Sequence, residues 1–248
     1  MMIGHGSQGT VYRNSGTGTV TKKFFNRPDF LHEVSILSHL RHAPHVASII
    51  DYNDDTNCLI MQDGGETLFD LRDDLEKNWV DVIARVLKAT SVLHKRRIVH
   101  GDIKLENILI DEFGDVRFCD FGHSRILQDY EVSKSTLTSL RGSPAYTSPE
   151  ILDGQPYDGF RSDVWSIGIL LFALVMNFFP FPRAKKGYKD YDSFVDLIVN
   201  HKQSPTDALL SLWKARVPEM EERATFIFSK TLDHLLHPCP EERSTFTT

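Results

Sequence analysis

Cysteine is scarce in this sequence, and its placement excludes two classes of small domain. The chain of 248 residues holds three cysteines, Cys58, Cys119 and Cys239. They lie far apart and show no zinc-ligand spacing, so we expect neither a disulfide framework nor a structural zinc site. Unpaired cysteines are typical of reducing compartments, and we therefore expect an intracellular protein of the cytoplasm, the nucleus or both.

Long apolar runs are absent as well. The most apolar stretch covers residues 167–179, which is shorter than the roughly 20 residues that a membrane-spanning helix needs, and we predict a buried helix there. The first residues, Met1 to Gly4, lack the basic and apolar regions of a signal peptide. The net charge of -6 gives no reason to expect nucleic acid or an anionic membrane as the main partner.

The N-terminal part of the sequence has mostly the pattern of β-strands. Residues 10–13 and 19–25 are β-rich runs joined by a hairpin turn signal, and residues 58–61 form a short apolar run. Between them, the apolar residues of 30–40 fall on one face of a helix. This part ends at Asp63-Gly64-Gly65, which breaks the pattern.

The rest of the sequence is mainly helical. Two apolar stripes at helical spacing are centred near residues 82–93 and 167–174, with two short strands at 108–110 and 116–118 between them. We predict an α+β fold and a single domain over residues 1–248. A small β-rich lobe covers residues 1–63, a larger and mainly helical lobe covers 64–248, and the cleft between them is a natural ligand site.

A glycine pattern opens the chain. Ile3-Gly4-His5-Gly6-Ser7-Gln8-Gly9-Thr10-Val11 matches G-x-G-x-x-G-x-V, a spacing that lets backbone N–H groups approach phosphates closely. The same glycines open dinucleotide-binding folds, but there a helix follows them. Here another β-run and a lysine pair follow. A glycine-rich turn without function is the alternative if nothing else supports the motif.

The strongest motif lies in the middle of the chain. His100-Gly101-Asp102-Ile103-Lys104-Leu105-Glu106-Asn107 is followed by Asp120-Phe121-Gly122. These segments resemble the H-R-D-x-K-x-x-N catalytic loop and the D-F-G metal-binding motif of protein kinases. A carboxylate at Asp102 can accept the proton of a substrate hydroxyl, and Lys104 can offset the charge of a transferring phosphoryl group. Asn107 and Asp120 offer the hard oxygen ligands that suit Mg²⁺.

Three further blocks resemble the eukaryotic-type protein kinases, in family order. They are Gly142-Ser143-Pro144-Ala145-Tyr146-Thr147-Ser148-Pro149-Glu150, Ser162-Asp163-Val164-Trp165-Ser166-Ile167-Gly168 and His237-Pro238-Cys239-Pro240-Glu241-Glu242-Arg243. The resemblance covers nearly the whole chain. It implies a two-lobed kinase fold, ATP and Mg²⁺ as cofactors, a protein serine or threonine as acceptor, and a buried ion pair between Glu150 and Arg243.

The resemblance also carries family site residues onto this sequence. The ATP-binding residues that it implies are Ile3, Gly4, Gly6, Gly9, Val11, Val20, Lys22, Glu33, Met61, Asp63, Glu66 and Leu109. Strand alternation points only one of Lys22 and Lys23 inward. The family pattern favours Lys22 with Glu33 as its partner, and the other register and a surface lysine pair remain as alternatives. Glu66 and Glu106 match positions that bind basic substrate residues in some kinases, although contact with the ATP ribose fits Glu66 equally well.

The sequence departs from the family in two places. Gly101 replaces the arginine of H-R-D, and His-Gly-Asp is also the signature of small-molecule kinases related to aminoglycoside and choline kinases. The first strand and the last helix are expected to be shortened, which keeps a pseudokinase-like binding module as another alternative. Ser143 and the loop 102–107 favour serine/threonine specificity. Without the arginine, we expect the activation segment with Ser139 to be competent unphosphorylated.

Overall fold

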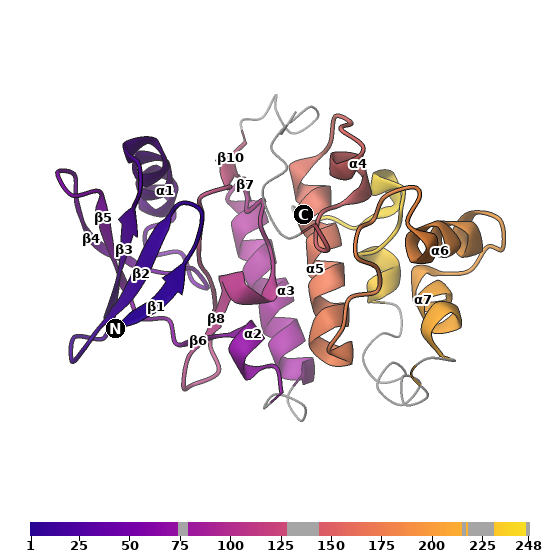
Figure 1. Ribbon diagram of the computed structural model, residues 1–248, viewed down its shortest axis with the longest axis horizontal. Helices are drawn as coiled ribbons and strands as arrows, with labels where there is room; N and C mark the ends of the chain where they lie inside the picture. The colour runs from indigo at the N-terminus through magenta and orange to yellow at the C-terminus, as the bar shows by residue number, and fades with distance from the viewer. Residues whose placement is uncertain (74–78, 128–143, 215–216, 218–230, 247–248) are drawn as a thin grey trace.

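The N-terminal part of the chain is an antiparallel five-stranded sheet with one helix packed against it (Figure 1). The computed structural model describes residues 1–73, 79–127, 144–214, 217 and 231–246. The strands lie in the order β1-β2-β3-β5-β4, and their bounds are Met2–His5 (β1), Gly9–Asn14 (β2), Thr19–Phe24 (β3), Ile49–Asn53 (β4) and Cys58–Gln62 (β5). Three of these strands were predicted. β4 was missed because four of its five residues are exposed, which leaves no alternating pattern to detect.

The predicted helix of this part is α1 (Arg27–His39). It begins after Asn26, whose side chain accepts a hydrogen bond from the N–H of Asp29, and Pro28 lies in its first turn. Phe30, Val34 and Leu37 are buried, as their spacing predicted. Because α1 packs on β3, β4 and β5, its inner face is directed at the sheet residues that approach the cleft.

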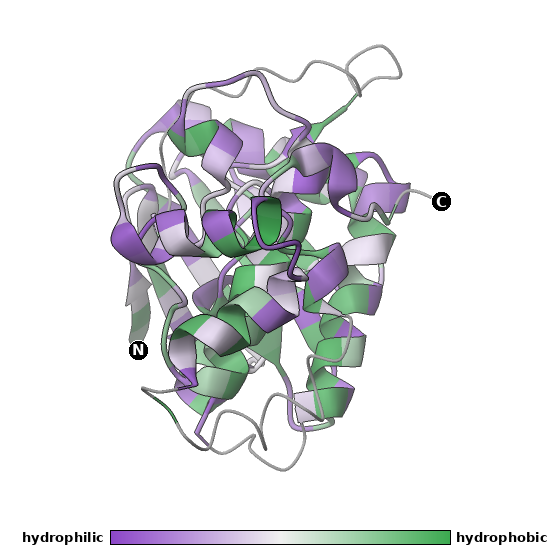
Figure 2. Cartoon of the chain, turned by 90° about the vertical axis from the view of Figure 1, so that its right-hand side faces the viewer, coloured by the Kyte–Doolittle hydropathy of each residue, from purple (hydrophilic) through white to green (hydrophobic). Residues whose placement is uncertain are grey.

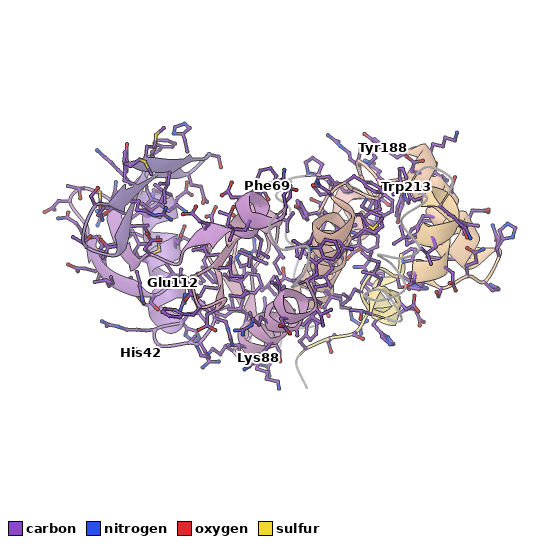
Figure 3. The ribbon with its side chains drawn as sticks, turned by 90° about the horizontal axis from the view of Figure 1, so that it is seen from below. His42, Phe69, Lys88, Glu112, Tyr188 and Trp213 are labelled. Atoms are coloured by element: carbon purple, nitrogen blue, oxygen red, sulfur yellow. The ribbon has the colours of Figure 1, made fainter. Side chains whose placement is uncertain are left out.

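The C-terminal part is mainly helical, which confirms the predicted α+β, two-lobed architecture. Its longer helices are α3 (Trp79–Lys95), α5 (Gly159–Met176), α6 (Lys189–Val199) and α7 (Pro205–Trp213), and its short ones are α2 (Leu68–Leu71), α4 (Pro149–Leu152), η1 (Leu105–Asn107), η2 (Leu232–His234) and η3 (Pro240–Glu242). α3 and α5 contact each other at the centre, and α6 and α7 lie at the end far from the sheet (Figure 1). Figure 3 shows the same arrangement from below, with Tyr188 and Trp213 at the opposite end from His42.

Helix α5 corrects one prediction. The apolar run over 167–179 was predicted to be a buried helix, and it is one up to Met176, where the helix ends; the helix starts earlier, at Gly159. It is the one helix of the described residues that is long and apolar enough to cross a membrane, and 89% of it is buried inside the fold. Asp158 caps its first turn, and Asn177 ends it in a left-handed conformation at φ 58. Unlike α5, the outer helices α6 and α7 are amphipathic and carry both hydrophilic and hydrophobic residues (Figure 2).

Short strands line the boundary between the two parts. β6 (Glu66–Thr67), β8 (Ile108–Ile110) and β9 (Val116–Phe118) form one small sheet, and β7 (Ile98–Val99) pairs with β10 (Arg125–Ile126). The two strands predicted from residues 108–118 are thus confirmed. The backbone of Phe118 exchanges hydrogen bonds with residues 45 and 47 of the N-terminal part, at 3.0 and 2.9 Å. These bonds fix the boundary strands against the N-terminal part.

Candidate active site

A cluster of three charged side chains, two of them buried, lies between the two parts. The ammonium Nζ of Lys22 lies 2.7 Å from Glu33 Oε2 and 2.8 Å from Asp120 Oδ1. Lys22 is buried and Lys23 is exposed, because successive side chains of β3 point to opposite faces. Burial opposes a charge on Lys22, but the two carboxylates outweigh it and raise the pKa of Lys22 above its ordinary value. Asp120 has a lowered pKa because Lys22 outweighs its burial in the same way.

The glycine motif forms the hairpin β1–β2 above this cluster. Its tip is closed by a hydrogen bond from the N–H of Gly6 to the carbonyl of Gly9, at 3.0 Å. A Cβ on Gly9 would lie 2.3 Å from the carbonyl oxygen of Lys23, whereas a Cβ on Gly6 would meet nothing within 4 Å. Gly9 is therefore required by packing, while Gly6 leaves its surroundings open to a ligand. Gly4 has only an ordinary contact with Val11, at 3.7 Å.

Several of the apolar residues predicted to bind ATP lie in the strands near the hairpin. Val20 and Met61 are buried and face each other in the paired strands β3 and β5. Leu109 of β8 approaches from the C-terminal part, close enough that a Cβ on Gly64 would lie 2.6 Å from its Cδ1. Val11 is half-buried, and Ile3 is exposed at the outer edge. Val11, Val20 and Met61 thus belong to one apolar cluster, while Leu109 lies against Gly64 and Ile3 is exposed.

Gln8 was not identified from the sequence. Its side chain is buried, and its Nε2 donates to the carbonyl of Gly122 at 3.3 Å. A Cβ on Gly122 would lie 1.9 Å from Gln8 Oε1, so this contact needs glycine at position 122. The tip of the glycine hairpin is thereby held against the segment that follows Asp120. Gln8 stands at a variable position of the glycine motif, and the pattern contains no signal for such a contact.

Two hydrogen-bond donors contact the same carboxylate oxygen of Asp102. Lys104 Nζ lies 2.7 Å and Asn107 Nδ2 3.0 Å from Asp102 Oδ2, and the same amide also donates to the backbone carbonyl of Asp102 at 2.8 Å. The other oxygen, Oδ1, makes no hydrogen bond among the described residues. A cavity of about 290 Å³ reaches Asp102 from the side of Tyr146 and Thr147. The carboxylate is thus fixed in orientation and still able to accept a proton.

Asn107 and Asp120 lie next to each other and can hold a metal ion. The N–H of Cys119 donates to the carbonyl of Asn107 at 3.0 Å, which sets Asp120 beside the catalytic loop, and Asp120 adopts a positive φ of 61. Because the Asn107 amide nitrogen is engaged with Asp102, its oxygen is the group left for a cation. Among the described residues no group of three or more His, Cys, Asp or Glu side chains forms a metal site. A pair of oxygen ligands fits Mg²⁺, which is commonly bound by one or two carboxylates together with substrate phosphates.

His100 is a structural side chain of the catalytic loop. It is fully buried between Phe118 and Phe121, with ring centroids 5.2 and 5.0 Å away. Burial lowers its pKa against the pull of nearby carboxylates, so the ring is neutral. Its Nδ1 accepts from the N–H of Asp102 at 3.3 Å, and Nε2 lies 3.1 Å from the carbonyl of Cys119, which assigns the proton to Nε2.

Asp163 anchors the same loop from helix α5. Its two oxygens accept the backbone N–H groups of His100 at 2.8 Å and Gly101 at 2.9 Å, and His94 Nε2 lies 3.1 Å away. Gly101 itself has φ 79, and a Cβ there would lie 2.7 Å from the carbonyl oxygen of His123. The glycine that replaces the family arginine is therefore required by the backbone. The sequence motif that contains Asp163 was recognised, but no role was predicted for Asp163 itself. An acidic residue in an otherwise apolar helix is a signal that could have indicated one.

Two of the carboxylates predicted to bind ATP, Asp63 and Glu66, are already paired. Arg13 of β2 contacts Asp63 Oδ2 through Nε at 2.6 Å and Glu66 Oε1 through Nη1 at 2.7 Å. Its Nη2 donates to the carbonyl of Gly65 at 2.9 Å. Glu66 thus has a partner that the sequence did not reveal, because the pairing joins positions more than fifty residues apart.

The ion pair predicted from the resemblance is confirmed. Arg243 Nη1 and Nη2 lie 2.7 and 2.9 Å from the two oxygens of Glu150, and the guanidinium stands 4.9 Å from the centre of the Trp165 ring. Both charged side chains are buried. This pair fixes the segment after residue 144 to the end of the chain. Ser139 and Ser143 lie outside the described residues.

Comparison with known proteins agrees with this geometry. The protein kinase domain family matches residues 1–248. The chain is 34% identical over 197 residues to serine/threonine-protein kinase 36 of Pongo abelii, covering 73% of this chain and 15% of that protein. It is 31% identical over 262 residues to serine/threonine-protein kinase TIO of Arabidopsis thaliana, covering 99% and 18%. It is 33% identical over 197 residues to NUAK family SNF1-like kinase 2 of Homo sapiens, covering 72% and 31%.

This chain spans less than a third of the length of each of these relatives. The family match covers the glycine hairpin, the catalytic loop and the final ion pair together, and it sets aside the small-molecule kinase alternative. The chain belongs to the protein kinase family.

Proposed function

We propose that this chain transfers the γ-phosphoryl group of Mg·ATP to serine or threonine hydroxyls of proteins. The observation that carries the proposal is the cluster of buried Lys22 and Glu33 with the partly exposed Asp120, which come from three separate segments, with Lys22 within 2.8 Å of both carboxylates. Burying charged groups such as Lys22 and Glu33 costs several kcal/mol per ion, so a fold that carries this cost points to a function for the cluster. A cation held in place beside the glycine hairpin is what the phosphates of ATP require.

The nucleotide would lie between the hairpin and β8. Val20, Met61 and Leu109 offer apolar contact to an adenine ring, and Gly6 leaves room for phosphates near the backbone N–H groups of the hairpin. Glu33 keeps Lys22 directed toward those phosphates. Asn107 and Asp120 would hold Mg²⁺, which offsets the negative charge of the phosphates when it is bound.

The acceptor hydroxyl would approach Asp102. The free oxygen Oδ1 orients the hydroxyl and accepts its proton, while Oδ2 stays with Lys104 and Asn107. Burial opposes a charge on Lys104, but Asp102 outweighs it and raises the pKa of Lys104. Lys104 is therefore cationic at neutral pH and can offset charge on the transferring group.

Serine/threonine specificity is supported by the names of the relatives, two of which are serine/threonine-protein kinases. The loop 102–107 is consistent with it. Cys58, Cys119 and Cys239 are free thiols, which fits the proposed cytoplasmic or nuclear location.

The test is phosphoryl transfer to a protein or peptide array by the purified chain and by Asp102→Asn. The control is Glu112→Gln, an exposed change in the turn between β8 and β9 (Figure 3). We expect Asp102→Asn to lose about 10²–10⁴-fold in transfer rate, as general-base loss does, while it still binds ATP and melts like the control. No transfer by the unaltered chain would favour the pseudokinase alternative. Near-normal transfer by Asp102→Asn would contradict the role of Asp102.

A further inference from the structure

Asp63 and Glu66 form an acidic rim next to the proposed nucleotide site, and Arg13 contacts both of them. Two nitrogens of its guanidinium donate hydrogen bonds: Nη1 to Glu66 at 2.7 Å, and Nη2 to Asp63 Oδ1 at 3.3 Å and to the carbonyl of Gly65 at 2.9 Å. Nε lies 2.6 Å from Asp63 Oδ2 as an ion pair but makes no hydrogen bond. The hydrogen bond with Glu66 is the main cause that raises the pKa of Arg13. Arg13 thus makes one charge-assisted hydrogen bond to each of the two carboxylates.

The rim is placed where a protein substrate would pass. Glu66 begins β6, which pairs with β8 and contacts η1, the helical turn that follows Lys104 in the catalytic loop. Its side chain is 52% exposed, compared with 22% for Asp63. A chain that presents its hydroxyl to Asp102 therefore runs close to Glu66.

Without Arg13, this rim would attract cations. Asp63 and Glu66 would present two carboxylates three positions apart on a chain of net charge -6. A lysine or arginine of a bound peptide could then form charge-assisted hydrogen bonds with them. Arg13 already makes those bonds from within the chain, so a basic peptide residue would first have to displace a tethered competitor at high effective concentration.

We propose that Arg13 determines substrate specificity: by holding Asp63 and Glu66, it prevents the cleft rim from selecting protein substrates with a basic residue near the acceptor. The inference rests on the proposed function and deepens it. Substrates of this chain thus need no arginine or lysine at the position that meets the rim, and the sequence-based expectation that Glu66 binds basic residues holds only when Arg13 is absent.

The experiment compares the unaltered chain with Arg13→Met, Arg13→Gln, Glu66→Gln and Arg13→Met/Glu66→Gln. Each is assayed on serine peptides that carry either arginine or glutamine at each position around the acceptor, and the ratio of kcat/KM for the two peptides is measured. For the unaltered chain we expect a ratio within about twofold at the position that meets the rim, which the Arg13 variants identify. In both Arg13 variants the ratio at one or more positions should rise about fivefold, the scale of one exposed charge-assisted contact.

The double variant separates specificity from a structural role. Its ratio should return to that of the unaltered chain, because the freed carboxylate of Glu66 is gone. The gain in the single Arg13 variants should also shrink as salt is raised. The inference would be overturned if the ratios were unchanged in both Arg13 variants, or if the gain persisted in the double variant. A change confined to the KM for ATP would overturn it as well. If the unaltered chain phosphorylates no peptide, the proposed function fails, and this inference fails with it.

Discussion

Substituting Gly101 by alanine tests why this chain has glycine where the family pattern has arginine. Gly101 has φ 79, a conformation that disfavours any residue with a Cβ, and its N–H donates to Asp163 at 2.9 Å. An added Cβ would lie 2.7 Å from the carbonyl oxygen of His123. That oxygen belongs to the backbone, so the contact can be relieved only by moving the catalytic loop or the segment after Asp120.

Two costs therefore add in Gly101→Ala. The left-handed conformation costs about 1–2 kcal/mol for a residue with a Cβ, and a forced backbone shift in a packed region costs about 1–3 kcal/mol more. Gly154→Ala is a matched control, because Gly154 has φ 66 but a Cβ there would meet nothing within 4 Å. The control carries the first cost alone. At roughly 2–4 °C for each kcal/mol, Gly101→Ala should melt about 2–12 °C below Gly154→Ala.

Thermal unfolding followed by circular dichroism measures the difference, with phosphoryl transfer assayed in parallel. Gly101→Arg meets the same contact, so we expect it to be at least as destabilised and not to gain activity. If Gly101→Ala melts at or above the temperature of Gly154→Ala, the close approach to His123 is not what requires glycine. The explanation for the missing arginine would then be wrong.

Three other predictions follow from the site. Lys22→Met should abolish phosphoryl transfer and Lys23→Met should leave most of it, since only Lys22 contacts Glu33; a radiolabel assay that gave the reverse would refute the assignment. Arg243→Met should destabilise the fold by about 3–5 kcal/mol in chemical denaturation, because it leaves the buried carboxylate of Glu150 unpaired. Adding Glu150→Gln should recover part of that loss, and an additive loss would argue against the ion pair. Burial lowers the pKa of His100, so the unfolded chain takes up that proton first and stability is lost as pH falls below about 6.5. The melting advantage of the unaltered chain over His100→Phe should therefore shrink between about pH 7.5 and pH 5.5, and a constant difference would contradict the buried neutral ring.

The sequence by itself determined the order of the elements and the family. Strand alternation placed Val20 and Lys22 on one face of β3 in the favoured register, and helical spacing identified the buried face of α1. These signals are local, because a side chain's direction along a strand or helix repeats every two or about 3.6 residues. Motif spacing likewise placed Asp102, Lys104 and Asn107 in one loop, where they do contact one another.

Only the tertiary structure decided the contacts between distant segments. Arg13 with Glu66, Gln8 with Gly122, and Asp163 with the backbone of the catalytic loop each join positions that share no local pattern. Their partners are set by how β2, the glycine hairpin and α5 pack, and packing depends on the whole fold. The apolar run alone did not reach the start of α5 at Gly159 for a related reason: its first turns carry polar residues such as Asp163, which lower the apolar signal but are buried. Local chemistry thus specified which groups are present in the cleft, and packing specified which of them are already engaged with one another.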